Sequence, residues 1–204
     1  MSPSTTRVPR RHAPLLAAAG QLALIIVGVY LGLWAEEWRE RRRDAELTRA
    51  SLVAFREEVQ RNRGELARNL AYHREVSDRL ADVWKRHVAS GQALSFAVLR
   101  SESGYDGTRF ADCTTSAYDL ALATQSLHDV SVSLALDLSR AYEHQRVLNR
   151  YQEQVAADLL GAAPDARGDW TRTAYVLAEG IAETRNHEIA LIAQYDDLLR
   201  HLRR

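Results

Sequence analysis

The sequence has few of the residues that build disulfide frameworks, thiolate metal clusters or irregular structure. Cys113 is the single cysteine among 204 residues, which excludes an intrachain disulfide and a thiolate cluster. Four prolines and ten glycines are also few for this length. Together with abundant Ala, Leu, Glu and Arg, this scarcity favours an all-α chain.

An excess of charge of one sign is also missing. Basic and acidic residues balance at 27 each, so no net field attracts nucleic acid, and we expect no nucleic-acid partner. The chain lacks a Gly-x-Ser-x-Gly elbow, a phosphate-binding loop and a His-Glu-x-x-His pair. The sequence therefore predicts no catalytic residue, no cofactor site and no metal site, and we do not expect an enzyme.

One long apolar run is present, from Leu15 to Ala35, and it contains no charged side chain. A helix of this length spans roughly 30 Å, the thickness of the hydrocarbon core of a bilayer. We predict a disordered basic tail at 1–13, a transmembrane helix at 14–35 in the lipid bilayer, and a helical domain at 36–204. A cleaved signal peptide is the rival interpretation. It would have a shorter apolar region, and Leu33 stands where cleavage needs a small residue.

Two patterns lie within and just after this run. Tyr30, Trp34 and Trp38 recur every four residues, which is typical of an aromatic belt at a membrane interface. Gly28 and Gly32 form a Gly-x-x-x-Gly pair that predicts a helix–helix seam, with the chance occurrence of small residues as the alternative.

The remaining chain has the periodicity of long amphipathic helices. From Glu36 to about Ala89 apolar residues alternate spacings of three and four, which predicts a coiled-coil-like helix continuous with the transmembrane helix. Residues 93–99 are expected to form a short helix or a turn, and three further helices are expected in an elongated bundle or hairpin. One is capped by Asp112 or Thr114 and runs to about Leu127; one begins after Asp129 or Ser131; the last is capped by Asp169 and runs from Trp170 to about Leu202.

Three polar residues, Asn62, Asn69 and His73, occupy positions on the apolar seam of the long helix. A buried Asn at such a position can fix helix register at a cost in stability. Our hypothesis is that these residues specify a paired-helix register, within the chain or between chains, so that Leu at positions 62 and 69 should raise thermal stability. The alternative is a wet seam whose polar residues face solvent.

The start of the chain also resembles a known bacterial family. Gly20-Gln21, Leu24-Ile25, Gly28-Val29, Leu31-Gly32-Leu33 and Trp38-Arg39-Glu40 are similar to the pattern of uncharacterised single-span membrane proteins. Leu52, Phe55, Glu58, Asn62 and Leu66 are similar to its continuation. Gln21, Gly32 and Arg39 depart from the pattern, which usually has Glu, Ala and Asn there. The resemblance implies a bacterial inner-membrane protein and implies no activity.

An N-terminal anchor with a short basic tail favours export of the chain beyond it, so we expect the C-terminal domain in the periplasm. The favoured function is a non-enzymatic interaction or scaffold module of the cell envelope, acting as a homo-oligomer or with an envelope protein. The alternative is a ligand- or metal-binding sensor domain that uses the loop from Ser101 to Phe110. Glu179, Glu183 and His187 share a helix face, but without a Glu-x-x-His pair we assign them to a solvated face.

Overall fold

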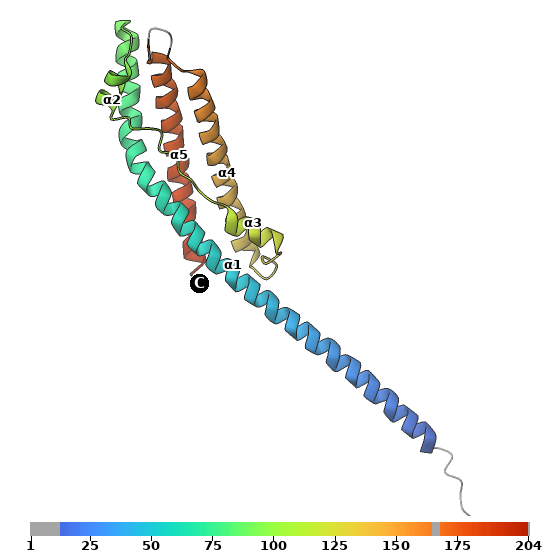
Figure 1. The fold of residues 1–204 in the computed structure, drawn as a ribbon. Helices are drawn as coiled ribbons and strands as arrows, with labels where there is room; N and C mark the ends of the chain where they lie inside the picture. Colours follow the sequence, from blue (N-terminus) through green and yellow to red (C-terminus); the bar gives the residue numbers. More distant parts are fainter. Residues whose placement is uncertain (1–12, 165–167, 204) are drawn as a thin grey trace, which may run out of the picture. The chain divides into compact units, whose positions relative to one another are not determined.

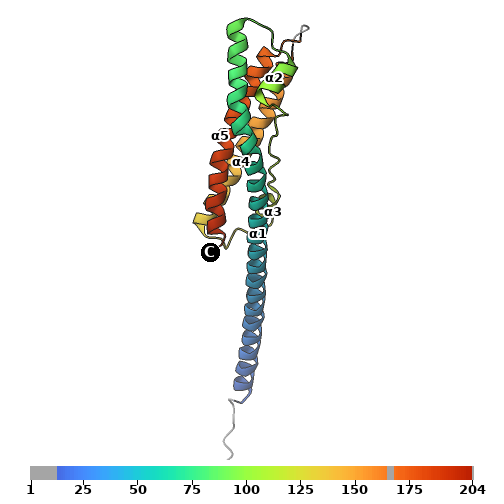
Figure 2. The same cartoon turned by 90° about the vertical axis from the view of Figure 1, so that its left-hand side faces the viewer.

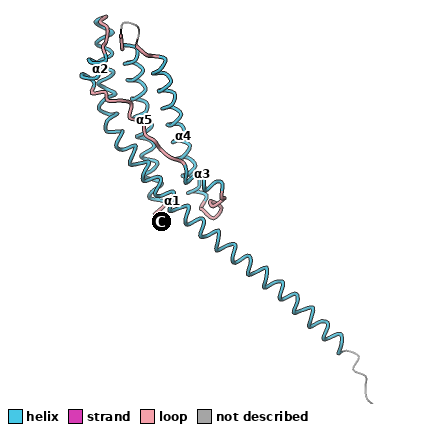
Figure 3. Tube along the Cα trace, viewed as in Figure 1, coloured by secondary structure: helices cyan, strands magenta, loops and turns pink. Residues whose placement is uncertain are grey.

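The computed structural model describes residues 13–164 and 168–203 (Figure 1). It contains five helices: α1 (Ala13–Ser90), α2 (Phe96–Ser103), α3 (Ser116–Ala123), α4 (Val132–Gly161) and α5 (Thr171–His201). No strand occurs in these two ranges, as Figure 3 shows. The prediction of an all-α chain with a long N-terminal helix is therefore confirmed. Residues 1–12 of the predicted disordered tail lie outside the described residues.

The chain divides into two units, Met1–Leu47 and Thr48–Arg204. The described part of the first unit is the beginning of α1. All side chains from Gly20 to Asp44 are exposed. Among the described residues, α1 is the one helix that is long and apolar enough to cross a membrane by length and composition, and none of its apolar window is buried.

Within the second unit, α4 and α5 lie side by side with the second part of α1 (Figures 1 and 2). The numbering of paired residues shows that α4 and α5 are antiparallel, since His144 meets His187 and Val155 meets Gly180. A Cβ atom at Gly180 would lie only 2.6 Å from Cγ1 of Val155. Glycine at this position therefore permits the close approach of the two helices.

Two hydrophobic clusters form the core of this unit. The first joins Phe55 and Leu66 of α1 to α3, α4 and the C-terminal half of α5. The second joins Val76 and Leu80 of α1 to α2 and the N-terminal half of α5. Apolar positions three and four residues apart along α1 supply both clusters, as expected for an amphipathic helix.

Helix ends follow local side-chain chemistry. Ser131, one of the two proposed caps of α4, accepts a hydrogen bond from the Leu134 N–H at 3.3 Å. The N-cap of α5 is Trp170 rather than the predicted Asp169, although Asp169 accepts from the Thr171 N–H at 2.9 Å. The predicted end of α3 near Leu127 is wrong. The helix ends at Ala123 because Gln125 adopts a left-handed conformation with φ of 55°.

Two further differences concern the region between α1 and α4. In the described residues four helices follow α1, because the stretch expected as a short helix or a turn forms α2, Phe96–Ser103, capped by Ser95 and ended by Gly104 at φ 74°. Neither Asp112 nor Thr114 is the N-cap of α3; Thr115 occupies that position. Between α2 and α3, residues 104–115 contain no helix, and we call them the 104–115 segment (Figure 3).

Candidate functional site

The predicted membrane residues lie on the exposed part of α1. Tyr30, Trp34 and Trp38 expose 72%, 66% and 51% of their surface. Cβ atoms placed at Gly28 and Gly32 would meet nothing within 4 Å. The aromatic stripe and the glycine pair lie on different faces of α1, and both faces are open in the single chain and available to lipid or to another helix.

Asn62 lies in the core of the second unit and binds the backbone of the 104–115 segment. Its amide nitrogen donates to the Thr114 carbonyl at 2.8 Å, and its amide oxygen accepts from the Thr114 N–H at 3.1 Å. Asn62 is 2% exposed, so these bonds replace those that water would make. Asn69 is half-buried, and its side chain makes no hydrogen bond to the described part of the chain. The two asparagines thus have different environments.

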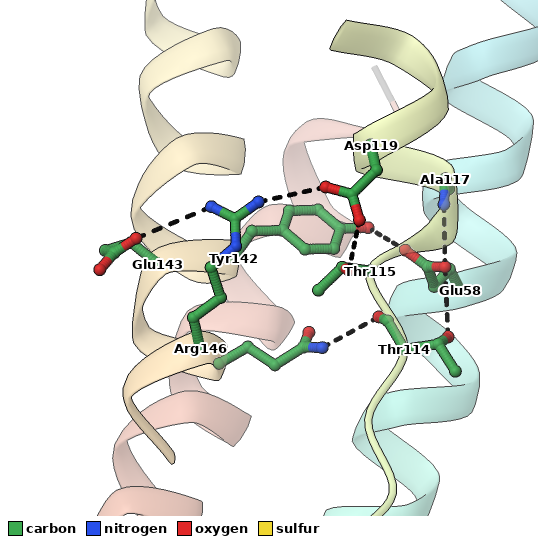
Figure 4. Close-up of polar contacts among 9 residues, drawn as sticks. Glu58, Thr114, Thr115, Ala117, Asp119, Tyr142, Glu143 and Arg146 are labelled. Atoms are coloured by element: carbon green, nitrogen blue, oxygen red, sulfur yellow. Dashed lines mark hydrogen bonds and ion pairs between the residues drawn. The ribbon is translucent and has the colours of Figure 1, made fainter. Parts of the chain in front are cut away.

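Glu58, one turn before Asn62, is a buried carboxylate with three donors (Figure 4). It accepts from the Tyr142 hydroxyl at 2.7 Å, from the Thr114 hydroxyl at 3.2 Å and from the Ala117 N–H at 3.0 Å. The side chain is 1% exposed. Neutral donors from α3, α4 and the 104–115 segment therefore solvate it in place of water.

Gln145 connects this group to α5. Its amide nitrogen donates to the Thr114 carbonyl at 2.9 Å, and its amide oxygen accepts from Asn62 at 3.2 Å and from the Tyr195 hydroxyl. Desolvation by burial raises the pKa values of Tyr142 and Tyr195. Both hydroxyls therefore keep their protons and act as donors at neutral pH. We call Glu58, Asn62, Thr114, Tyr142, Gln145 and Tyr195 the polar core network.

His73 forms a second buried polar contact, between α1, α5 and the 104–115 segment. Its Nε2 lies 2.7 Å from the Thr108 carbonyl, which can only accept, so Nε2 carries a proton. Its Nδ1 lies 2.9 Å from Oε2 of Glu188. This second contact also requires a proton, held by the imidazole or by the carboxyl group. The pair therefore buries one shared proton.

The His73–Glu188 pair has no access to solvent. Both side chains are 0% exposed, and burial raises the pKa of Glu188. The other carboxyl oxygen of Glu188, Oε1, has no partner in the part of the chain that the structure describes. On α1 the pair lies between Leu66 of the first hydrophobic cluster and Val76 of the second, and on α5 between Leu191 and Ile181. It separates the two clusters.

The 104–115 segment is bound mainly through its backbone. Tyr72 donates to the Gly107 carbonyl at 2.8 Å and accepts from the Asp106 N–H at 2.8 Å. Asn149 donates to the Cys113 carbonyl at 3.4 Å. Together with Asn62, His73 and Gln145, these side chains from α1 and α4 pair the polar backbone groups that a buried loop would leave unsatisfied.

No reactive group is exposed in this network. Burial raises the pKa of Cys113 to about 12, so the thiol stays protonated and is a poor nucleophile. A hollow of about 300 Å³ lies between Phe110, Asp112 and the Asn149–Ala156 face of α4, and neither Glu58 nor His73 lines it. Among the described residues, no group of three or more His, Cys, Asp or Glu side chains is placed to hold a metal ion.

In the loop proposed for a sensor, Ser101–Phe110, the charged side chains interact with residues of the loop and its neighbours. Asp106 lies 2.9 Å from Arg109 and 3.7 Å from Arg100. The guanidinium of Arg109 stacks over the Tyr72 ring, 4.2 Å from its centroid. The polar side chains of this loop therefore hold it against α1.

Comparison of the chain with protein-family models, with curated proteins and with solved structures found no match.

Sequence reasoning missed most of the polar core network. Tyr142 and Tyr195 have the helical spacing of apolar residues, although a buried phenol needs a hydrogen-bond partner. Glu58 stands out only within the family motif, four residues before Asn62. This spacing puts the two polar side chains on one helix face and is the signal that could have found them. Glu188 gives no signal, because its partner His73 is 115 residues away.

Proposed function

We propose that the chain is a membrane-anchored, non-enzymatic helical module of the bacterial cell envelope. In this proposal residues 14–35 cross the inner membrane once, and the helical domain lies in the periplasm. The observation that carries the proposal is the exposure of the whole apolar stretch of α1 from Gly20 onward. In water such a surface is unfavourable, whereas in lipid it needs no protein partner.

The second unit supports an interaction role over a chemical one. Its buried polar groups bind its own backbone, and its cysteine is protonated and buried. The resemblance to single-span bacterial membrane proteins is consistent with the proposed location and architecture. We further propose that the module acts with a second copy of itself or with an envelope protein.

An aromatic surface near α2 suits contact with a protein partner. The rings of Phe96 and Trp170 are 4.7 Å apart, and those of Trp84 and Tyr175 are 5.0 Å apart. Phe96 exposes 41% and Tyr175 44% of its surface. Aromatic side chains with one buried and one exposed side are enriched in protein interfaces.

Membrane orientation is tested with a reporter fused after Arg204. Alkaline phosphatase, which folds only outside the cytoplasm, should be active there, and a cytoplasmic reporter should be inactive. The reverse result would place the domain in the cytoplasm and refute the periplasmic location.

Association is tested by cross-linking in native membranes followed by detergent extraction. We expect a dimer or a specific complex with an envelope protein. Gly28→Leu with Gly32→Leu should disrupt a helix-mediated dimer, whereas Ile26→Leu, on the opposite side of the helix, should not. Phe96→Ser with Tyr175→Ser should remove a partner bound at the aromatic surface. A monomer with no cross-linked partner would refute the interaction role.

A further inference from the structure

Two histidines from neighbouring helices converge on one point at the surface of the second unit. Nε2 of His144 on α4 lies 3.2 Å from Nδ1 of His187 on α5, and the ring centroids are 5.4 Å apart. The close packing of α4 and α5 at Gly180 and Val155 holds the two backbones in place. A site on two packed helices is more rigid than one on a loop.

The outer nitrogens of both rings face acceptors. Nδ1 of His144 lies 3.1 Å from Oε1 of Gln194, an amide oxygen that can only accept, so Nδ1 carries the proton. Nε2 of His187 lies 3.7 Å from Oε1 of Glu183, which is longer than a hydrogen bond but places a carboxylate beside that nitrogen. The inner nitrogens are hydrogen-bonded to each other, so with the Nδ1 proton of His144 directed at Gln194, the Nδ1–H of His187 donates to Nε2 of His144.

A metal ion can take the place of this single proton, since loss of the proton leaves two lone pairs 3.2 Å apart that face the same point. Zinc in tetrahedral coordination has nitrogen ligands at about 2.05 Å, which places two such nitrogens about 3.3 Å apart. The spacing of the inner nitrogens therefore suits one shared metal ion. The outer contacts match the usual arrangement of metal-binding histidines, whose second N–H is held by a carboxylate or a carbonyl oxygen.

The surroundings are acidic, which favours a cation. Tyr151, whose ring centroid lies 5.6 Å from that of His187, also lies near carboxylates. Burial, and then the charges of Glu183, Glu179 and Asp158, raise its pKa. Glu183 thus has two roles in this geometry: it orients His187 and contributes negative charge.

We propose that His144 and His187 bind a divalent transition-metal ion such as Zn²⁺ or Cu²⁺ through Nε2 and Nδ1. Water or an external ligand fills the other coordination positions, because no third protein ligand is placed there among the described residues. Such an open site binds metal exchangeably. The proposal is independent of the membrane-anchored interaction role, since it concerns only α4 and α5.

The test is a Zn²⁺ titration of the detergent-solubilised full-length chain after chelator treatment, read by competition with a chromophoric chelator. One ion per chain is expected. His144→Ala and His187→Ala should each weaken binding at least tenfold. His128→Ala is the matched control, because His128 is an exposed histidine beside Asp129 with no second histidine, and it should leave the affinity unchanged.

The outer contacts give a finer test. Glu183→Gln should weaken Zn²⁺ binding about tenfold, and Gln194→Glu should strengthen it, because a carboxylate raises the basicity of the histidine it orients. Electron paramagnetic resonance of bound Cu²⁺ should show two imidazole nitrogens, and one in either alanine variant.

Three results would overturn the proposal. The first is Zn²⁺ binding that survives in His144→Ala and His187→Ala. The second is an equal loss of binding in His128→Ala. The third is the absence of metal binding, with nuclear magnetic resonance showing a single proton shared by the two rings. None of these results bears on the cross-linking experiment, so failure of this site and failure of the proposed function are distinguishable.

Discussion

The two parts of α1 differ in which side chains they expose and which they bury. Between Gly20 and Ala35 the side chains are almost all apolar, and all are exposed. Between Glu58 and His73 the same helix buries a carboxylate, an amide and an imidazole, each less than 3% exposed. One backbone conformation therefore serves two environments, and the side chains decide which environment each part requires.

The difference shows that a helix can bury polar side chains where the chain supplies their hydrogen-bond partners. The exposed apolar part has no protein contacts to satisfy and suits a surrounding of lipid, in line with the proposed membrane span. The buried polar part is stable only because each polar group has a matching donor or acceptor in the chain. Changes in the first part should alter location, and changes in the second should alter folding.

The largest effect is expected at the His73–Glu188 pair. His73→Ala leaves Glu188 buried without its partner and should lower the free energy of unfolding by about 3–5 kcal/mol. Urea unfolding of the detergent-solubilised chain, followed by circular dichroism, measures it. His73→Leu combined with Glu188→Met replaces the pair by apolar side chains and should recover most of the loss. An equal loss in the double variant would show that the pair itself stabilises the domain.

A charge in the exposed apolar part is the next largest change. Ile25→Arg should oppose membrane insertion by about 3 kcal/mol and move the chain from the membrane fraction to the soluble or aggregated fraction. Val53→Arg is the matched control, since Val53 is also an exposed apolar residue of α1, at 52%. If both variants stay in the membrane fraction, the apolar stretch is not the anchor.

The two asparagines of α1 allow a hydrogen-bonded side-chain amide to be compared with one that has no such bond. Asn62→Leu leaves the N–H and carbonyl of Thr114 without Asn62 and should cost about 2 kcal/mol. Asn69→Leu should change stability by less than about 0.5 kcal/mol. These contacts reverse the sequence-based expectation that Leu at position 62 stabilises the chain. Thermal unfolding of the two single variants measures whether Leu at position 62 stabilises or destabilises the chain. A more stable Asn62→Leu variant would support the register hypothesis.

The smallest effect is expected for the partly exposed ion pair of Arg63 and Asp196. The hydrogen bond from Arg63, at 2.6 Å, lowers the pKa of Asp196 below its ordinary value of 3.8. The pair therefore contributes stability above about pH 4 and loses it as the pH falls through the folded-state pKa. Asp196→Asn should cost under about 1 kcal/mol at pH 7 and nothing below that pKa. Urea unfolding at pH 7 and pH 3 measures the free energy of unfolding of the Asp196→Asn variant and compares it with that of Asp197→Asn.

Helices were predictable because their signals are local. The long helix ends at Ser90, next to the expected end near Ala89, and Ser131 caps α4, since spacing and capping depend on neighbours in sequence. The boundaries of α3 were not predictable, because Thr114 binds Asn62 and Glu58 across the core instead of capping. Thr114 takes part in these tertiary contacts and therefore does not cap α3, although its local sequence favours that role.

The candidate sites were harder to predict, because their partners are far apart in sequence. Asn62 and His73 are identifiable from their places on the apolar seam, but Thr114 and Glu188 lie 52 and 115 residues away. His144 and His187 show no common spacing, and only the antiparallel packing of α4 and α5 brings them together. A single sequence does not indicate which distant residues form such pairs.

The manner in which the 104–115 segment is held has a consequence for sequence divergence. Tyr72, His73, Asn149 and the polar core network bind its N–H and carbonyl groups, which every residue except proline presents alike. The helices therefore supply most of the side-chain donors and acceptors, while the segment adds the Thr114 hydroxyl bonded to Glu58 and the buried side chains of Ala111 and Cys113. Only the exposed side chains that make none of these contacts, such as that of Asp112, are free to change from one homologue to another while the same contacts persist.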